Sequence, residues 1–423
     1  MTNIKVYNGN QIGGCITVIS TDNTSIMIDF GEDLPSNIKH NKYNFDWSSN
    51  TIDAVLFTHY HGDHIGRFDE IPNNVSVYMG KLTRMIMKSI YKRVGNQEQI
   101  DILNNDLRIK EIKQNQTIII GDIKITPYMI DHSAYDAYMY LIETPDKTIL
   151  HTGDFRTHGY RGKAVIPLIK KYIRKNGKRD IDVLIVEGTT ITRKSKRIYS
   201  ENDMKKDAIN LFKNQKYVFL ICSSVNLDSL ATFYQAAKSQ HIKTYANRYV
   251  IEQLDNFSKT AGTMTDLYNF KYTYPVNFDK VIKSKKLRKD VTQEEFMRKE
   301  GFLIIIKPEE YCKEWIERFV DLNPTIVYSM WKGYVDINNK ACIKEWVDFL
   351  NNYDDVVYMH TSGHITPEEL TEVIKTVAPR EAIIPIHTED AEKFKLLDIG
   401  EYAKLVKIDD YIIGEETEYE KRN

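Results

Sequence analysis

The sequence predicts an α/β fold with two domains, the second of which is inserted into the first. The chain has 423 residues, which is enough for two or three domains of ordinary size. Apolar, β-branched runs alternate with helical stretches along most of its length. The pattern changes near residue 192 and returns near residue 355. We therefore predict a first domain over 1–195, an inserted domain over 196–354 and a return segment over 355–423.

The elements of the first part are short apolar runs bounded by turn residues, which is typical of strands. We predict strands over 4–7, 15–20, 25–29, 52–58, 75–79, 116–120, 123–130, 138–144, 147–152 and 182–188, and one helical stretch over 81–105. In the inserted part we predict helices over 205–215 and 227–240 and strands over 217–222, 242–246, 302–307 and 325–330. The return segment begins with a strand over 356–359. A helix capped by Thr366 follows, and a last strand covers 382–386.

Composition bears on the cellular location of the protein. The four cysteines are far apart and form no CxxC pair, so we expect reduced, structural thiols and a cytoplasmic protein. The amino-terminal residues contain no apolar signal core, and there is no apolar run of about 18 residues. We therefore expect no membrane partner.

The net charge of −1 gives no overall basic field that would indicate a nucleic-acid partner. Basic residues do gather in three segments, Lys170–Arg179, Arg193–Arg197 and Lys283–Lys289. Each is either a solvated face or part of a groove that follows a nucleic-acid backbone, and the second reading predicts strongly salt-dependent binding.

The chemistry concentrates in the loop His59–His64 (H-Y-H-G-D-H), which directly follows a predicted buried strand. A strand would send His59 and His61 to one face and His64 to the other. A tight loop at Gly62 lets these side chains converge. Imidazole nitrogens and carboxylate oxygens are the ligands of catalytic zinc sites. The alternative is a histidine-rich surface loop without a metal, which four such groups directly after a strand make improbable.

Further histidine and carboxylate side chains follow other predicted strands. They are Asp29, His132, Asp154, Glu187, His364 and His387. A single residue of this kind at a strand end is usually a turn residue, and Asp29 could equally be a turn carboxylate or a support for the metal loop. A dinuclear site, however, needs more ligands than one loop supplies, and a carboxylate can bridge two ions. Glu187 ends an apolar strand, so it should have a partner.

These motifs resemble the signature of the metallo-β-lactamase superfamily, with H-x-H-x-D-H at His59–His64, His132 and Asp154 downstream, and Asp29 upstream. Glu187 in V-E-G-T-T, His364 in H-T-S-G-H and His387 in P-I-H-T-E resemble three further motifs of its β-CASP branch, which includes ribonuclease J and the endonuclease of pre-mRNA cleavage and polyadenylation. The resemblance covers about residues 10–415. It implies an α/β fold of αββα layers, the metallo-β-lactamase fold, with an inserted α/β β-CASP domain.

Two departures from the family pattern accompany this resemblance. The common E-S-T form appears here as E-G-T, with Gly188 in place of the serine. The chain also ends soon after the last motif, so we expect no additional C-terminal domain like the one that serves assembly in bacterial ribonuclease J. The oligomeric state is therefore open, and a homo-oligomer is one of the states it allows.

The resemblance also implies roles for individual residues. Two zinc ions are implied, one held by His59, His61 and His132, the other by Asp63, His64 and His387, with Asp154 as the bridge. The implied reaction is hydrolysis of RNA phosphodiester bonds by a hydroxide that the two metal ions share. We expect Asp63 to orient this hydroxide and His364, held by Glu187, to assist the leaving 3′-oxygen.

The expected substrate is single-stranded RNA. Ser362 and the turn with Ser223 and Ser224 are candidates for binding neighbouring phosphates, because this turn begins a predicted helix whose free N–H groups suit an anion. The alternative is ordinary helix capping by Ser224 or Asn226.

Two other functions compete with this interpretation. One is a metallohydrolase of the same fold that acts on DNA or a small phosphodiester. The other is a catalytically silent binding subunit, which would be expected to lack metal ligands, whereas all seven positions are filled here. A β-lactamase proper is disfavoured because the inserted domain would close over the site and no secretion signal is present.

Overall fold

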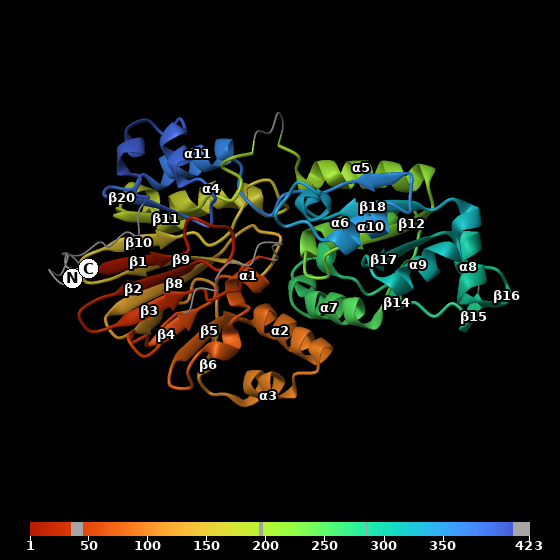
Figure 1. Ribbon diagram of the computed structural model, residues 1–423, viewed down its shortest axis with the longest axis horizontal. Helices are drawn as coiled ribbons and strands as arrows, with labels where there is room; N and C mark the ends of the chain where they lie inside the picture. Colours follow the sequence, from red (N-terminus) through yellow and green to blue (C-terminus); the bar gives the residue numbers. More distant parts are fainter. Residues whose placement is uncertain (35–44, 194–197, 285, 409–423) are drawn as a thin grey trace. The chain divides into compact units, whose positions relative to one another are not determined.

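The computed structural model (Figure 1) describes residues 1–34, 45–193, 198–284 and 286–408. Of these, residues up to Ile198 and from Gly363 onward form one compact unit, and Tyr199–Ser362 form another. The predicted boundary at residue 195 and part of two predicted basic segments, namely Lys194, Lys196, Arg197 and Lys285, lie outside the described residues. The domain boundaries assigned from the sequence stay a prediction.

The first unit contains two six-stranded sheets. One has the strand order β1 (Asn3–Tyr7), β2 (Ile16–Ser20), β3 (Ser25–Ile28), β4 (Ala54–Leu56), β5 (Ser76–Gly80) and β6 (Ile109–Ile112). The other has the order β20 (Ala382–Ile386), β11 (Val183–Glu187), β10 (Thr148–His151), β9 (Tyr138–Glu143), β8 (Ile123–Met129) and β7 (Ile118–Ile120). Strands β3 to β6 are parallel to one another, as are β10, β11 and β20.

The two sheets enclose a common core and carry helices on their outer faces. Ile26 of one sheet belongs to the same buried cluster as Ile142 of the other. On the outer face of the first sheet, Met87 of α2 (Lys81–Val94) and Leu103 of α3 (Gln97–Asn105) pack with buried strand residues. On the second, α4 (Val165–Leu168) and α11 (Pro367–Val377) do the same (Figure 1). This order of layers confirms the predicted αββα fold.

Three local features differ from the sequence prediction. The single helical stretch predicted over 81–105 is two helices, because Gly95 ends α2 in the left-handed conformation at φ +76° and the Asn96 side chain caps α3. The histidine loop is also not entirely irregular, since it contains the one-turn helix α1 (Gly62–Ile65). The sequence analysis also missed the strand β6.

The second unit is built on a parallel sheet. Its strand order is β14 (Thr273–Pro275), β13 (Thr244–Ala246), β17 (Phe302–Ile306), β12 (Tyr217–Cys222), β18 (Thr325–Ser329) and β19 (Val356–Tyr358). Its helices are α5 (Glu201–Asn214), α6 (Leu227–Ser239), α7 (Arg248–Lys259), α8 (Gln293–Glu300), α9 (Glu310–Glu317) and α10 (Lys344–Leu350), and a small hairpin joins β15 (Val281–Ser284) and β16 (Lys289–Thr292). β19, assigned from the sequence to the return segment, pairs here with β18. No helix of the described residues is both long and apolar enough to cross a membrane.

Candidate metal centre

The strand ends of the first unit bring all nine predicted metal and catalytic residues together. The loop His59–His64 follows β4, His132 follows β8, Asp154 follows β10 and His387 follows β20, while Glu187 ends β11 and His364 precedes α11. These residues form four overlapping groups in which one donor atom from each residue lies within 4.8 Å of the others: His59, His61 and His132; His59, His64 and Asp154; Asp63, His64 and His387; and Asp154, Glu187, His364 and His387. Segments far apart in the sequence therefore supply one site.

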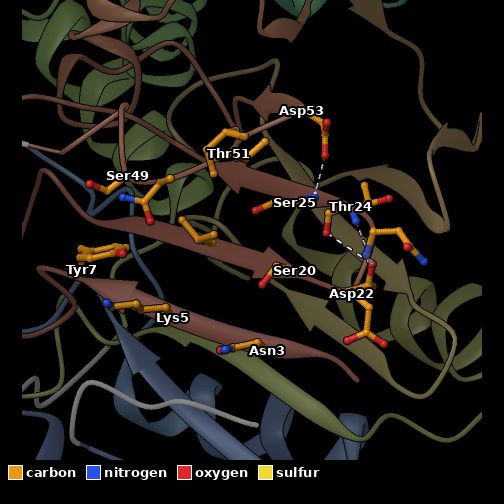
Figure 2. A pocket seen from close by; sticks show the side chains of 15 residues that line it. Asn3, Lys5, Tyr7, Ser20, Asp22, Thr24, Ser25, Ser49, Thr51 and Asp53 are labelled. Carbon is orange, nitrogen blue, oxygen red and sulfur yellow. Dashed lines mark hydrogen bonds between the residues drawn. The ribbon is translucent and has the colours of Figure 1, made fainter. Parts of the chain in front are cut away.

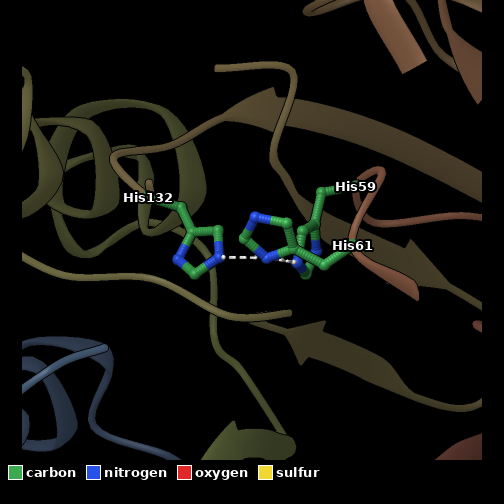
Figure 3. A group of neighbouring side chains, drawn as sticks. All are labelled: His59, His61 and His132. Atoms are coloured by element: carbon green, nitrogen blue, oxygen red, sulfur yellow. Dashed lines mark hydrogen bonds between the residues drawn. The ribbon is translucent and has the colours of Figure 1, made fainter. Parts of the chain in front are cut away.

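The first group consists of three imidazole rings that meet edge to face, with ring nitrogens close to one another (Figure 3). Nδ1 of His61 lies 3.0 Å from Nε2 of His59 and 3.2 Å from Nε2 of His132. Burial lowers the pKa of His59 and His132 well below the usual value, and it lowers the pKa of His61 to about 4. All three rings are therefore neutral at physiological pH.

The partners of the outer ring nitrogens show which nitrogen carries the hydrogen. Nδ1 of His132 lies 2.6 Å from the carbonyl oxygen of Gly363, which only accepts, so this nitrogen donates and Nε2 keeps its lone pair. The Thr58 hydroxyl donates to Asp29 Oδ2 at 2.7 Å. It therefore accepts from Nδ1 of His59 at 3.0 Å, and Nε2 of His59 is also free of hydrogen.

At least two imidazole lone pairs therefore converge on one point, with at most one hydrogen, on His61, between them. Such an arrangement is unfavourable by itself and suits a bound cation. The chemistry of these donors, three neutral imidazoles, fits zinc. The residues present thus fit the metal site that the sequence predicts.

The groups that contain His64 add two carboxylates, those of Asp63 and Asp154. Asp63 Oδ2 lies 3.2 Å from Nε2 of His387 and 3.8 Å from Nε2 of His64, which in turn lies 3.0 Å from Asp154 Oδ2. Burial alone would raise the pKa of Asp63, but the nearby His64 lowers it below its usual value. Among the described residues, the buried Oδ1 of Asp154 has no hydrogen-bond partner. A buried carboxylate oxygen without a hydrogen-bond partner fits a position between two cations.

Glu187 has the partner that the sequence analysis required. Its Oε1 accepts the N–H of Phe155 at 2.7 Å, and its Oε2 lies 2.9 Å from Nδ1 of His364. Burial opposes protonation of His364, but Glu187 and Asp154 raise its pKa above the usual value. The side chain of Glu187 is fully buried, whereas that of His364 is 22% exposed. Glu187 and Asp154 therefore favour the protonated form of His364, and its ring is accessible from solvent.

Asp29 lies directly behind the histidine loop rather than serving only a turn. Its carboxylate accepts the N–H and the hydroxyl of Thr58, both at 2.7 Å, and lies 2.8 Å from Nδ1 of His64. Thr58 and Gly31 were not predicted from the sequence as residues that support the histidine loop. A Cβ at Gly31 would lie 1.9 Å from the carbonyl oxygen of Asp63, so glycine is required for this close approach. The D-F-G sequence after β3 was the available signal.

The departure at Gly188 has a packing explanation. A Cβ at this position would lie 2.5 Å from Cε2 of Phe394 and 3.0 Å from Cβ of Thr388. Phe394 is fully buried in the core beneath α11. The Phe394 ring fills the space that a serine side chain at position 188 would need. Glycine at position 188 therefore leaves room for Phe394.

The three predicted phosphate-binding serines lie in the second unit. Asn226, not Ser224, caps α6 by accepting the N–H of Ser229 at 3.1 Å. Ser224 is buried, while Ser223 and Ser362 are partly exposed. Their role in binding substrate stays a prediction.

Two of the basic segments contain surface ion pairs. In Lys170–Arg179, Arg174 lies 3.6 Å from Asp180 and Arg179 lies 3.7 Å from Glu143. In Lys283–Lys289, Lys286 pairs with Glu300. These pairs favour the solvated-face interpretation for part of each segment.

A separate hollow lies on one face of β1, β2 and β3 (Figure 2). Lys5, Asp22 and Asp53 line it among hydroxyl and amide side chains, and Asp53 accepts the N–H of Ser25 at 2.8 Å. Ser25 begins β3, whereas Asp29 follows its end. The hollow contains none of the clustered histidines, so it is not the candidate metal centre.

Comparison with known proteins relates the chain to hydrolases. Residues 24–215 match a beta-lactamase superfamily domain, and residues 353–397 match a Zn-dependent metallo-hydrolase RNA specificity domain. Ribonuclease J of Mycoplasma pneumoniae is 23% identical over 365 residues, which cover 80% of this chain and 58% of that protein. Cleavage and polyadenylation specificity factor subunit 3-II of Arabidopsis thaliana is 29% identical over 209 residues, covering 44% and 32%. The chain thus spans less than two thirds of the length of either relative.

A solved structure has the same fold. The crystal structure of a protein of unknown function from Enterococcus faecalis V583 superposes with a TM-score of 0.70 at 18% identity, covering 93% of this chain and 95% of that one. At this identity the likeness concerns the fold alone.

Proposed function

The chain belongs to the metallo-β-lactamase superfamily, in the branch with a β-CASP insertion, and on that premise we propose that it is a zinc-dependent ribonuclease. The observation that carries the proposal is the convergence of nine histidine and carboxylate side chains at the strand ends of the first unit. The match to an RNA specificity domain spans His364 and His387 and supports RNA as the substrate. Four buried free thiols support the cytoplasm as its location.

In this proposal the site holds two zinc ions. One would be held by His59, His61 and His132, the other by Asp63, His64 and His387, with Asp154 shared between them. Two such ions would acidify a water molecule and stabilise the charge that develops on a phosphoryl group during hydrolysis. The remaining steps fall to the side chains around this pair.

Asp63 and His364 would handle protons on the two sides of the reacting phosphate. Burial would raise the pKa of Asp63 but His64 lowers it, so the carboxylate stays ionised and can accept a hydrogen bond from the attacking water. Nδ1 of His364 donates to Glu187, which leaves Nε2 to give a proton to the leaving 3′-oxygen. Ser223, Ser224 and Ser362 are proposed to bind neighbouring phosphates.

The test is cleavage of end-labelled single-stranded RNA by the wild type and by His364→Ala, with zinc content measured for both. We expect the variant to keep its zinc and lose cleavage by roughly a hundredfold to ten-thousandfold, the range of general acid catalysis. His158→Ala is the matched control, because His158 pairs with Glu369 at 3.0 Å in a similar way but lies outside the cluster.

Two results would count against this proposal. If the zinc-loaded wild type left RNA intact but split DNA or a small phosphodiester, the protein would be a metallohydrolase of another substrate class. If His364→Ala cleaved RNA as fast as the wild type, His364 would have no role as the acid.

A further inference from the structure

We propose that Thr189 is a positioning residue that connects His387 to the carboxylate of Glu187, an inference that rests on the proposed metal centre. The Thr189 hydroxyl lies 2.7 Å from Glu187 Oε2 and 2.8 Å from Nδ1 of His387. All three side chains are buried. Thr189 lies two positions after the end of β11, and His387 directly follows the neighbouring strand β20.

The single hydrogen of the hydroxyl decides the direction of this chain. If Thr189 donated to Nδ1 of His387, or to the carbonyl oxygen of His387 at 3.2 Å, its oxygen would face Glu187 Oε2 at 2.7 Å without a hydrogen between two acceptors. Donation to the carboxylate removes that repulsion, and a hydrogen bond to a charged acceptor is also the stronger one. Thr189 therefore accepts from Nδ1 of His387, and in the neutral ring the lone pair is then on Nε2.

Nε2 of His387 lies 3.2 Å from Asp63 Oδ2, and in the neutral ring of this tautomer no hydrogen stands between the two atoms. A lone pair facing a carboxylate is a favourable arrangement only when a cation lies between them. Thr189 thus holds the neutral ring of His387 in the tautomer whose Nε2 can bind a metal.

The same device occurs a second time in the site. Thr58 donates to Asp29 at 2.7 Å and accepts from Nδ1 of His59 at 3.0 Å. Thr58 follows β4 in one sheet and Thr189 follows β11 in the other. Each proposed zinc ion therefore has one ligand that is held by a carboxylate–threonine–histidine chain.

Glu187 consequently organises more than the proposed acid His364. Its Oε1 accepts the N–H of Phe155, the residue next to Asp154, and its Oε2 serves both His364 and Thr189. One carboxylate therefore orients the proposed proton donor, one proposed zinc ligand and the loop of the bridging aspartate.

The experiment compares Thr189→Val, Thr189→Ser and Thr190→Val with the wild type. Valine keeps the shape and removes the hydroxyl, and serine restores the hydroxyl. Thr190 is the matched control, because it is an adjacent buried threonine whose hydroxyl bonds the carbonyl oxygen of Ile365. Zinc stoichiometry and affinity are measured by competition with a chromophoric chelator, and the cobalt-substituted proteins are compared by their absorption spectra.

We expect Thr189→Val to bind one of its two zinc ions roughly ten- to a hundredfold more weakly, as is typical for loss of an outer hydrogen-bond partner. Thr189→Ser and Thr190→Val should keep both ions at wild-type affinity. The proposal is overturned if Thr189→Val also keeps both, if serine fails to restore the affinity, or if Thr190→Val shows the same loss.

This readout does not depend on RNA cleavage. A wild type that binds two zinc ions but cleaves no RNA would refute the proposed ribonuclease and leave the test of Thr189 intact. A wild type that binds fewer than two ions would refute the two-ion centre itself.

Discussion

Replacing Asp29 by asparagine should disturb the candidate metal centre, although every proposed metal ligand is left in place. The Asp29 carboxylate accepts three hydrogen bonds, from the N–H and the hydroxyl of Thr58 and from Nδ1 of His64. An amide oxygen can still accept the Thr58 N–H. The amide nitrogen, however, then faces the N–H of His64, so donor meets donor. His64 must turn its Nδ1 into an acceptor and move the hydrogen to Nε2, the atom proposed to bind zinc.

The structure gives the size of this effect. The hydrogen bond between Nδ1 of His64 and Asp29 is 2.8 Å long, buried and charge-assisted, so about 1.5–3 kcal/mol favours the metal-binding tautomer. Since every 1.4 kcal/mol is tenfold in affinity, zinc at the second position should bind roughly ten- to a hundredfold more weakly. Reversal of the Thr58 hydroxyl would weaken the His59 contact as well, so the first position should also lose affinity.

The assay is zinc competition against a chromophoric chelator, combined with nitrogen-15 NMR of the imidazole rings to identify the tautomer of His64. Asp182→Asn is a suitable control. Asp182 is also buried and accepts a backbone N–H, that of Thr148 at 2.7 Å, but it pairs with Arg380 outside the cluster. If Asp29→Asn bound zinc like the wild type and kept the hydrogen on Nδ1 of His64, the tautomer argument would be refuted.

Three further predictions concern the rest of the first unit and the thiols. Gly188→Ser should destabilise the fold by about 1–3 kcal/mol through overpacking against Phe394, and Phe394→Leu should recover part of this in urea unfolding. The pKa of Glu369 is lowered by its bonds to His158 and Thr157 despite burial, so its stabilising effect is complete above its unfolded pKa and disappears as the pH falls through the folded one. The difference in unfolding free energy between wild type and Glu369→Gln should therefore shrink below about pH 4, and a constant difference would contradict this origin. All four cysteines are buried, so iodoacetamide at pH 8 should label them only after denaturant is added, as mass spectrometry would show.

The sequence was sufficient for the layers of the fold and for the family. Strand periodicity and the H-x-H-x-D-H spacing depend only on neighbouring residues. The predicted αββα layers are confirmed, while the metal-binding role of the H-x-H-x-D-H residues stays a prediction. The strand ends at His132, Asp154 and His387 could be listed from the sequence, but only the sheet order shows that they meet. The break at Gly95 was missed because helical periodicity continues across it.

The supporting hydrogen bonds could not be predicted from the sequence. Thr58 and Thr189 are ordinary residues in a pattern search, and their roles depend on which carboxylate and which imidazole nitrogen face each hydroxyl. Gly188 was noted as a departure, but its reason lies in Phe394, a residue remote in sequence. The catalytic and metal roles of the site residues stay predictions until zinc and cleavage are measured.

The neighbouring strands β11 and β20 are separated in the chain by the whole of the second unit. A ribosome making this protein therefore releases His59, Asp154 and Glu187 long before His387. During that interval the nascent chain could bind a zinc ion at the proposed site of His59, His61 and His132. It could not yet complete the proposed site that needs His387. The proposed nuclease would therefore stay inactive beside the messenger RNA that encodes it until His387 has been synthesised.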